Sequence, residues 1–97
     1  MALFCLYCID RPNSLEVRLG ARADHLAYVG AFAERILVAG PLLDDEGGMR
    51  GSMILMDFED RAAAEAFSAA DPYVKAGLFE RVEIRPMRAS IGTAARP

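Results

Sequence analysis

The 97-residue sequence has no tryptophan, one histidine and two cysteines, and its charges form no run of one sign longer than three residues. Two cysteines give no disulfide framework, so a reducing, cytoplasmic setting is expected. No apolar stretch approaches the roughly 20 residues that span a bilayer, and no basic segment precedes the first apolar residues, so neither a membrane span nor a signal peptide is expected. Eleven basic and fourteen acidic residues are scattered, with a net charge of −3, which argues against a partner that is a nucleic acid or a membrane surface.

Hydrophobic residues, in contrast, make up 54% of the chain. A chain of this length is expected to form a single domain over residues 1–97, and so small a domain leaves much of its surface exposed. The high hydrophobic share therefore predicts that a second chain covers part of this surface. The small, polar residues 89–97 are expected to be frayed or packed against a partner.

Four segments have the length and composition of β-strands. Residues 3–9 and 51–58 carry continuous apolar runs, which are typical of strands buried on both faces. Residues 36–43 include Pro41, which cannot donate to a strand ladder and favours a sheet edge. In residues 78–87 apolar and charged residues alternate, as in a strand with one buried and one solvent-exposed face. Leu78, Val82 and Ile84 lie on one side, and Arg81, Glu83 and Arg85 lie on the other.

Between these segments the sequence predicts two main helices. Over residues 14–33 a stripe with helical spacing is expected to face the core, with Asn13 or Ser14 as the cap and Glu16 completing a capping box. Its members are Leu15, Leu19, Arg22, Leu26, Val29 and Ala33. Asp60 is expected to cap the second helix. The apolar face of this second helix is expected to consist of Ala63, Ala66, Phe67 and Ala70.

The stretch from Asp71 to Gly77 predicts a further short helix with both ends marked. Asp71 is a preferred N-cap residue, because its carboxylate can accept from the free N–H groups of the first turn. Pro72 suits the first helical position, and Gly77 supplies the left-handed stop. Such a turn can fix a carboxylate in one place.

The order β-α-β-β-α-β predicts a ferredoxin-like α+β fold with an antiparallel four-stranded sheet in the order 4-1-3-2. The two segments that are apolar throughout would be the central strands, and both helices would cover one face. The other face of the central strands also needs cover. A homodimer with the two sheets packed face to face is the simplest cover.

His25 lies within or beside the apolar side of the first helix, where an imidazole needs a polar partner. It is either a satisfied core histidine or a general base. Asp71 is either a helix cap only or also the carboxylate that orients His25, since one carboxylate can accept several hydrogen bonds. Arg22 is either a surface arginine or an anion clamp beside the base.

The remaining motifs do not indicate a redox, metal or phosphate site. Cys5 and Cys8 match C-x-x-C, but residues three apart in a strand point to opposite faces, so both are expected to be core thiols. With one histidine and a solvated turn at residues 44–46, no metal site is expected. No glycine-rich phosphate loop is present, and no redox cofactor is expected.

Several short segments together resemble the YciI-like (YCII-related) family, a member of the dimeric α/β barrel superfamily. They are Arg22–Tyr28, Ala39–Leu42, Gly51–Ser52, Asp71–Tyr73 and Ala76–Phe79. The resemblance implies a ferredoxin-like dimeric α/β barrel and an active site on a histidine–aspartate pair, which falls on His25 and Asp71. The family's arginine falls on Arg22, and its Gly-Pro and Gly-Ser elements place Gly40, Pro41 and Ser52 in the wall. A related branch is associated with dehydrochlorination of chlorinated aromatic compounds, a lyase reaction.

The expected function is therefore a small-molecule enzyme, a lyase or isomerase that acts by proton abstraction. His25 would be the base, Asp71 would orient it, and Arg22 would hold an anionic or enolate oxygen, with Ser52 or Tyr73 assisting. A module that binds a small acidic metabolite without turnover is the alternative. A structural dimer whose histidine belongs only to the core is a third interpretation.

Overall fold

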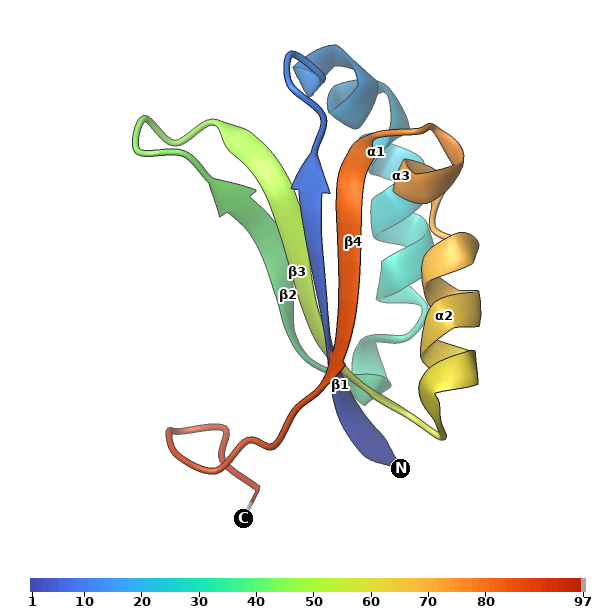
Figure 1. The fold of residues 1–97 in the computed structure, drawn as a ribbon, viewed down its shortest axis with the longest axis vertical. Coiled ribbons are helices and arrows are strands. Elements are labelled where there is room, and N and C mark those ends of the chain that lie inside the picture. Colours follow the sequence, from blue (N-terminus) through green and yellow to red (C-terminus); the bar gives the residue numbers. More distant parts are fainter. Residues whose placement is uncertain (97) are drawn as a thin grey trace.

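The computed structural model describes residues 1–96 and shows one antiparallel sheet in the order β2-β3-β1-β4, with the helices on one face (Figure 1). This is the predicted order read from the opposite edge, so the ferredoxin-like α+β fold is confirmed. The elements are β1 (Ala2–Asp10), α1 (Leu15–Gly30), the 3₁₀ helix η1 (Ala33–Arg35), β2 (Ile36–Leu43), β3 (Met49–Phe58), α2 (Arg61–Ala69), α3 (Pro72–Lys75) and β4 (Phe79–Pro86).

The hydrophobic core fills the space between the sheet and the helices. Alternate residues of the two central strands point into it, as the pleat of a strand requires, and Val29 of α1 and Phe67 of α2 close it from the helix side. The strand residues in this cluster are Phe4 and Leu6 of β1 and Ile54, Met56 and Phe58 of β3. Pro41 lies on the edge strand β2, as predicted.

The predicted core-facing stripe of α1 is confirmed at Val29 but is wrong for its leucines. Leu15, Leu19 and Leu26 are 41%, 53% and 52% exposed, whereas the buried residues of α1 are Arg18, His25 and Val29. The helix is therefore turned by about one position, or 100°, from the phase that its leucines indicate. Polar side chains occupy the inner face because partners on the sheet and on α3 satisfy them.

The helix ends follow the predictions in part. Asp60 caps α2 by accepting from Ala63 N at 2.8 Å, and Gly77 ends α3 with a φ of 72°. The capping box at α1 is absent, because Ser14 Oγ donates to the carbonyl of Pro12 instead. On α2 the buried residues are Ala64, Phe67 and Ser68, while Ala66 is exposed, so that face was only partly predicted.

One glycine sets the spacing of the central strands. A Cβ on Gly51 would lie 2.4 Å from the carbonyl oxygen of Cys8 on β1, so only glycine permits this approach. Gly51 pairs with Ile9, and the next residue, Ser52, pairs with Cys8. Ser52 is thereby held against the buried end of β1.

Among residues 1–96, no helix covers the outer face of the sheet (Figure 1). Cys5 belongs to this face and Cys8 to the helix-covered face, and both thiols are free, as expected for a C-x-x-C pair in a strand. Tyr7 on this face is 37% exposed. Within residues 1–96, no helix combines the length and apolar character needed to cross a membrane. Near the C-terminus, Arg96 makes two hydrogen bonds to Asp57 of β3, while Pro97 of the predicted frayed tail lies outside the described residues.

Candidate active site

The predicted site residues come together around a cavity of about 90 Å³ between α1, α3 and the strands β2 and β3. His25, Arg22, Ser52, Tyr73, Gly40 and Pro41 all line it. Asp71 reaches it through His25. A side chain that the sequence analysis did not single out, Arg18, lines the same cavity.

His25 and Asp71 form a buried hydrogen-bonded pair. The Nδ1 atom of His25 lies 2.8 Å from Oδ1 of Asp71, and the two residues are 8% and 5% exposed. A carboxylate accepts, so Nδ1 carries a proton, and in the neutral imidazole this leaves the lone pair on Nε2. This arrangement gives the imidazole a single tautomer with a basic nitrogen available to a ligand.

The same carboxylate oxygen also caps α3. Oδ1 of Asp71 accepts from Tyr73 N at 2.9 Å, as the sequence predicts for an N-cap residue followed by proline. The cap and the histidine partner are therefore one atom. The two interpretations of Asp71 are compatible in this structure.

Tyr73 stacks on the imidazole. The ring centroids of His25 and Tyr73 are 3.8 Å apart with an interplanar angle of 16°. The guanidinium carbon of Arg18 lies 4.6 Å from the same ring centroid. Arg18 and His25 are two helical turns apart, about 10.5 Å along the axis, so the tyrosine ring fits between them. Burial raises the pKa of Tyr73, with Arg18 and Arg22 opposing it, and the phenol is protonated at neutral pH.

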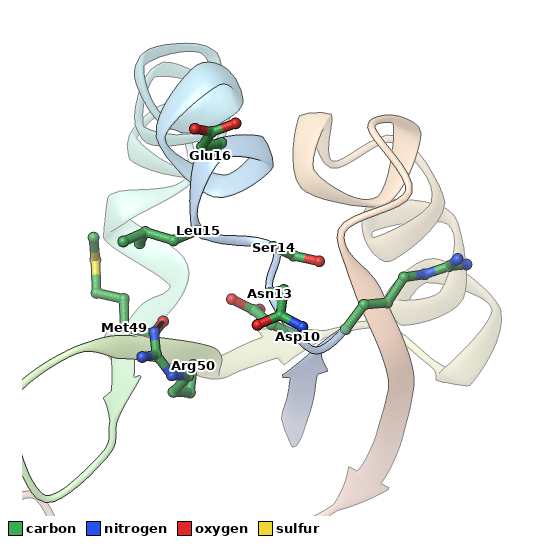
Figure 2. A pocket seen from close by; sticks show the side chains of 8 residues that line it. Asp10, Asn13, Ser14, Leu15, Glu16, Met49 and Arg50 are labelled. Atoms are coloured by element: carbon green, nitrogen blue, oxygen red, sulfur yellow. Dashed lines mark hydrogen bonds between the residues drawn. The ribbon is translucent and has the colours of Figure 1, made fainter.

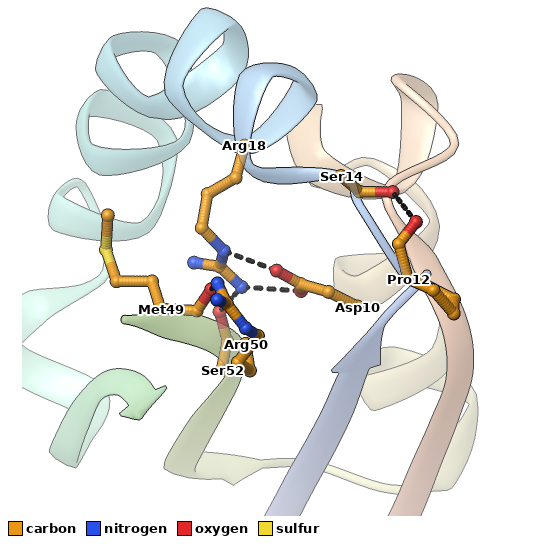
Figure 3. A network of polar contacts seen from close by, with 7 residues as sticks. All are labelled: Asp10, Pro12, Ser14, Arg18, Met49, Arg50 and Ser52. Atoms are coloured by element: carbon orange, nitrogen blue, oxygen red, sulfur yellow. Dashed lines mark hydrogen bonds and ion pairs between the residues drawn. The ribbon is translucent and has the colours of Figure 1, made fainter. Parts of the chain in front are cut away.

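Arg18 is the centre of a second buried polar network (Figure 3). Its Nε and Nη2 atoms each donate to the carboxylate of Asp10 at 2.8 Å, and Nη2 also donates to Ser52 Oγ at 3.0 Å. Arg18 is only 1% exposed. Burial lowers the pKa of Arg18, but the hydrogen bond and the charge of Asp10, together with Tyr73, outweigh burial and raise the pKa above its usual value, so the guanidinium is charged.

The sequence analysis missed Arg18 and Asp10. Arg18 lies seven residues before His25, so a helical phase set by His25 places it on the inner face, whereas a phase set by the leucines does not. Asp10 follows the first predicted strand (residues 3–9), and the sequence assigned it no role. Its role depends on where β1 ends relative to α1, which a local pattern does not encode.

Arg22 and the Gly-Pro element lie at the edge of the site. Arg22 lines the cavity but is exposed, and it makes no hydrogen bond or ion pair within residues 1–96. A Cβ on Gly40 would meet no atom within 4 Å, so close packing in this chain does not require a glycine there. Pro41 pairs with Ser52 across the β2–β3 ladder and lines the wall.

A second, larger cavity of about 350 Å³ lies on the other side of Asp10, between the start of α1 and the start of β3 (Figure 2). Met49 lines both cavities. The buried Cys8 thiol lies beneath the site, where burial, and secondarily Asp71, raises its pKa to about 12. Across residues 1–96, no three side chains of histidine, cysteine, aspartate or glutamate come together as metal ligands.

These features define a class: a small ferredoxin-like protein with a buried histidine–aspartate pair that opens on a narrow cavity. Residues 2–88 match the YCII-related domain family, and the chain belongs to that family. It is 39% identical to Protein YciI of Escherichia coli O6:H1 over 94 residues, covering 89% of this chain and 96% of that protein.

Two solved structures share the fold. The chain resembles 5-chloro-2-hydroxyhydroquinone dehydrochlorinase (TftG) from Burkholderia phenoliruptrix AC1100, in complex with 2,5-dihydroxybenzoquinone, with a TM-score of 0.85 and 35% identity over 97% of this chain and 99% of that chain. An antibiotic biosynthesis monooxygenase shares the fold alone, with a TM-score of 0.55 and 13% identity over 92% of this chain and 98% of that chain.

Proposed function

We propose that this chain is a small-molecule lyase or isomerase in which His25 abstracts a proton from the substrate. The observation that carries the proposal is the 2.8 Å contact between His25 Nδ1 and Asp71 Oδ1 beside a cavity that His25 lines. A base held in one tautomer and facing a cavity is the arrangement that proton abstraction needs. The likeness to a dehydrochlorinase supports an elimination on a hydroxylated aromatic compound.

In this mechanism the Nε2 lone pair of His25 takes the proton, and Asp71 stabilises the imidazolium that forms. In a dehydrochlorination of such a compound, the keto tautomer has an sp³ C–Cl carbon, and the base takes a proton from a ring hydroxyl. The O–H electron pair becomes part of a C=O bond, the ring C=C bond shifts to the C–Cl carbon, and chloride leaves with the C–Cl pair. Arg22 or Ser52 would hold the substrate oxygen on which negative charge develops, and the protonated Tyr73 can donate a hydrogen bond. General base catalysis of this kind supplies about 10²- to 10⁴-fold in rate.

The proposal includes a homodimer built through the outer face of the sheet, in a cytoplasmic setting. That face is apolar at its centre and has no helix over it, and Val38 on the edge strand is 51% exposed. Burying such a face against its own copy removes apolar area from water at about 25 cal/mol per Å². Tyr7 and Leu55, from adjacent central strands, would lie in the interface.

The test is an activity assay that measures chloride release and loss of substrate absorbance. The first substrate is 5-chloro-2-hydroxyhydroquinone, and other hydroxylated and halogenated aromatic compounds are tested next. His25→Gln should lower kcat/KM by at least about 10²-fold, and Asp71→Asn should lower it as well. Asp24→Asn, an exposed acid on the same helix, is the control and should retain wild-type kinetics. Turnover that survives His25→Gln would contradict the proposal. Tight binding without any turnover would favour a metabolite-binding module.

A further inference from the structure

The buried guanidinium of Arg18 is the feature of the site that the His25–Asp71 pair does not explain. A charge is expensive to bury unless it is paired and hydrogen-bonded. Arg18 is 1% exposed and is paired with Asp10, yet it also lines the cavity beside His25 and Tyr73. Its position puts a permanent positive charge beside the expected base.

The hydrogen bonds of Arg18 leave one of its nitrogens available. A guanidinium has five N–H groups, and Arg18 uses those on Nε and Nη2 for Asp10 and Ser52. Within residues 1–96 no hydrogen bond leaves from Nη1, and Figure 3 shows this atom pointing away from Asp10. The ring of Tyr73 lies against the guanidinium face. The two N–H groups of Nη1 can therefore donate to a ligand oxygen, beside the Tyr73 hydroxyl that also interacts with this guanidinium.

Ser52 adds a second donor at the same place. Its Oγ accepts from Arg18 Nη2 at 3.0 Å, so its own proton points elsewhere. Ser52 is 4% exposed and lines the cavity. Because Gly51 fixes the approach of β3 to β1, this hydroxyl is held rigidly.

Arg22, in contrast, is neither buried nor fixed by a hydrogen bond within residues 1–96. It is exposed at the rim, and the structure shows no group within residues 1–96 that fixes its side chain. Holding an exposed, unanchored side chain against a ligand costs conformational entropy. Fixed donors that need no reorganisation stabilise developing charge best.

We propose that Arg18 and Ser52 form the oxyanion subsite of this cavity, and that the ligand is a planar hydroxylated ring or enolisable carbonyl compound bound through an ionised oxygen. The assignment rests on the proposed function for the role of His25 as base. Arg18 and His25 lie against the same tyrosine ring, at 4.6 Å and 3.8 Å from its centroid. The imidazole centroid and the guanidinium carbon are therefore separated by at most the sum of these two distances, 8.4 Å. One conjugated ring can bridge this span, with its acidic position toward His25 and its ionised oxygen toward Arg18.

Binding of 2,5-dihydroxybenzoquinone to the full chain tests the assignment without turnover. This compound is an acid whose visible absorbance changes with ionisation, so one titration reports both affinity and the charge state of the bound probe. The wild-type protein should bind the anion and shift ionisation of the probe to lower pH. Ser52→Ala and Arg18→Lys should each weaken binding by about tenfold or more, the expected loss of a hydrogen bond to a charged group, and reduce the shift.

Arg50→Gln is the control for charge. It removes one positive charge from the same strand as Ser52, but Arg50 pairs with Asp44 and does not line the cavity. Its affinity should stay within about twofold of wild type, since exposed charges are screened. Circular dichroism checks that each variant is folded, and Ser52→Ala keeps the Asp10–Arg18 pair if Arg18→Lys is too unstable.

The assignment is overturned if Ser52→Ala and folded Arg18→Lys bind the probe like wild type. It is also overturned if Arg22→Gln alone abolishes the ionisation shift. These outcomes are separate from the failure of the proposed function, which would be turnover independent of His25 while the probe still bound through Arg18 and Ser52.

Discussion

The buried pair of Arg18 and Asp10 gives the sharpest stability prediction. Their side chains are 2% and 6% exposed and are joined by two 2.8 Å hydrogen bonds. Replacing Arg18 by Met leaves Asp10 as an unpaired buried carboxylate, and removing one partner of such a pair costs about 3–5 kcal/mol. A domain of this size is stable by about 5–15 kcal/mol, so the variant should lose a large share of its stability.

The double variant separates the two causes of this loss. Arg18→Met together with Asp10→Leu removes both charges and keeps similar volume. Replacing a buried ion pair by apolar residues is often neutral or stabilising. The double variant should therefore be more stable than Arg18→Met by about 2 kcal/mol or more, although it should no longer bind the anionic probe.

Urea unfolding followed by circular dichroism measures the free energy of unfolding for the whole cycle. Thermal unfolding gives an independent value, with Arg18→Met lowering Tm by at least roughly 12 °C. Arg50→Met, at an ion pair whose arginine is 57% exposed, is the matched control and should cost less than about 1 kcal/mol. The reasoning is refuted if Arg18→Met is as mild as this control, or if the double variant is no more stable than the single one.

Three other measurements test the remaining structure. Nitrogen-15 NMR of the single histidine should show His25 protonated on Nδ1, and Asp71→Ala should give a mixture of tautomers; an Nε2–H wild type would contradict the pair. Burial raises the pKa of Cys8 to about 12, so the thiol ionises at a lower pH in the unfolded chain than in the folded one. The free energy of unfolding should therefore fall as the pH rises above about 8.5, by about 1–2 kcal/mol at pH 10. Cys8→Ala should lack this part of the decline, and equal declines in the two proteins would contradict the assigned pKa. Sedimentation should show a dimer that Tyr7→Glu dissociates and the exposed-helix change Glu65→Lys does not; a monomeric wild type would remove the proposed interface.

The fold was predictable because its signals are local or periodic. Two continuous apolar runs identified the central strands, Pro41 identified an edge, and the alternation of residues 78–87 identified the other edge. The phase of α1 was not predictable in this way. The three exposed leucines outnumber the apolar residues that face the core from this helix. The apolar periodicity therefore predicts that the solvent-exposed side of α1 faces the core.

Several apolar side chains of α1 and of the sheet are exposed. Leu15, Leu19 and Leu26 are about half exposed, and the outer sheet face adds Tyr7 and Val38. A chain with 54% hydrophobic residues thus places a substantial part of them outside its own core. This distribution is why the composition indicated a second copy even though the assumed helix face was wrong.

The two halves of the candidate site differ in how far the sequence can specify them. Asp71, Pro72 and Tyr73 are consecutive, and one carboxylate oxygen fixes both the start of α3 and the tautomer of His25. A local signal for a helix cap therefore also located the hydrogen-bond partner of His25. Arg18 and Asp10 meet only because β1 ends where the first turns of α1 pass over it, and the charge of each is satisfied by the other. Neither residue has a local signal, since an arginine on a helix and an aspartate after a strand are ordinary surface features. A short motif therefore predicts the His25–Asp71 pair, which proton abstraction would use. The position of Arg18, which would hold the resulting negative charge, depends on packing across the whole domain.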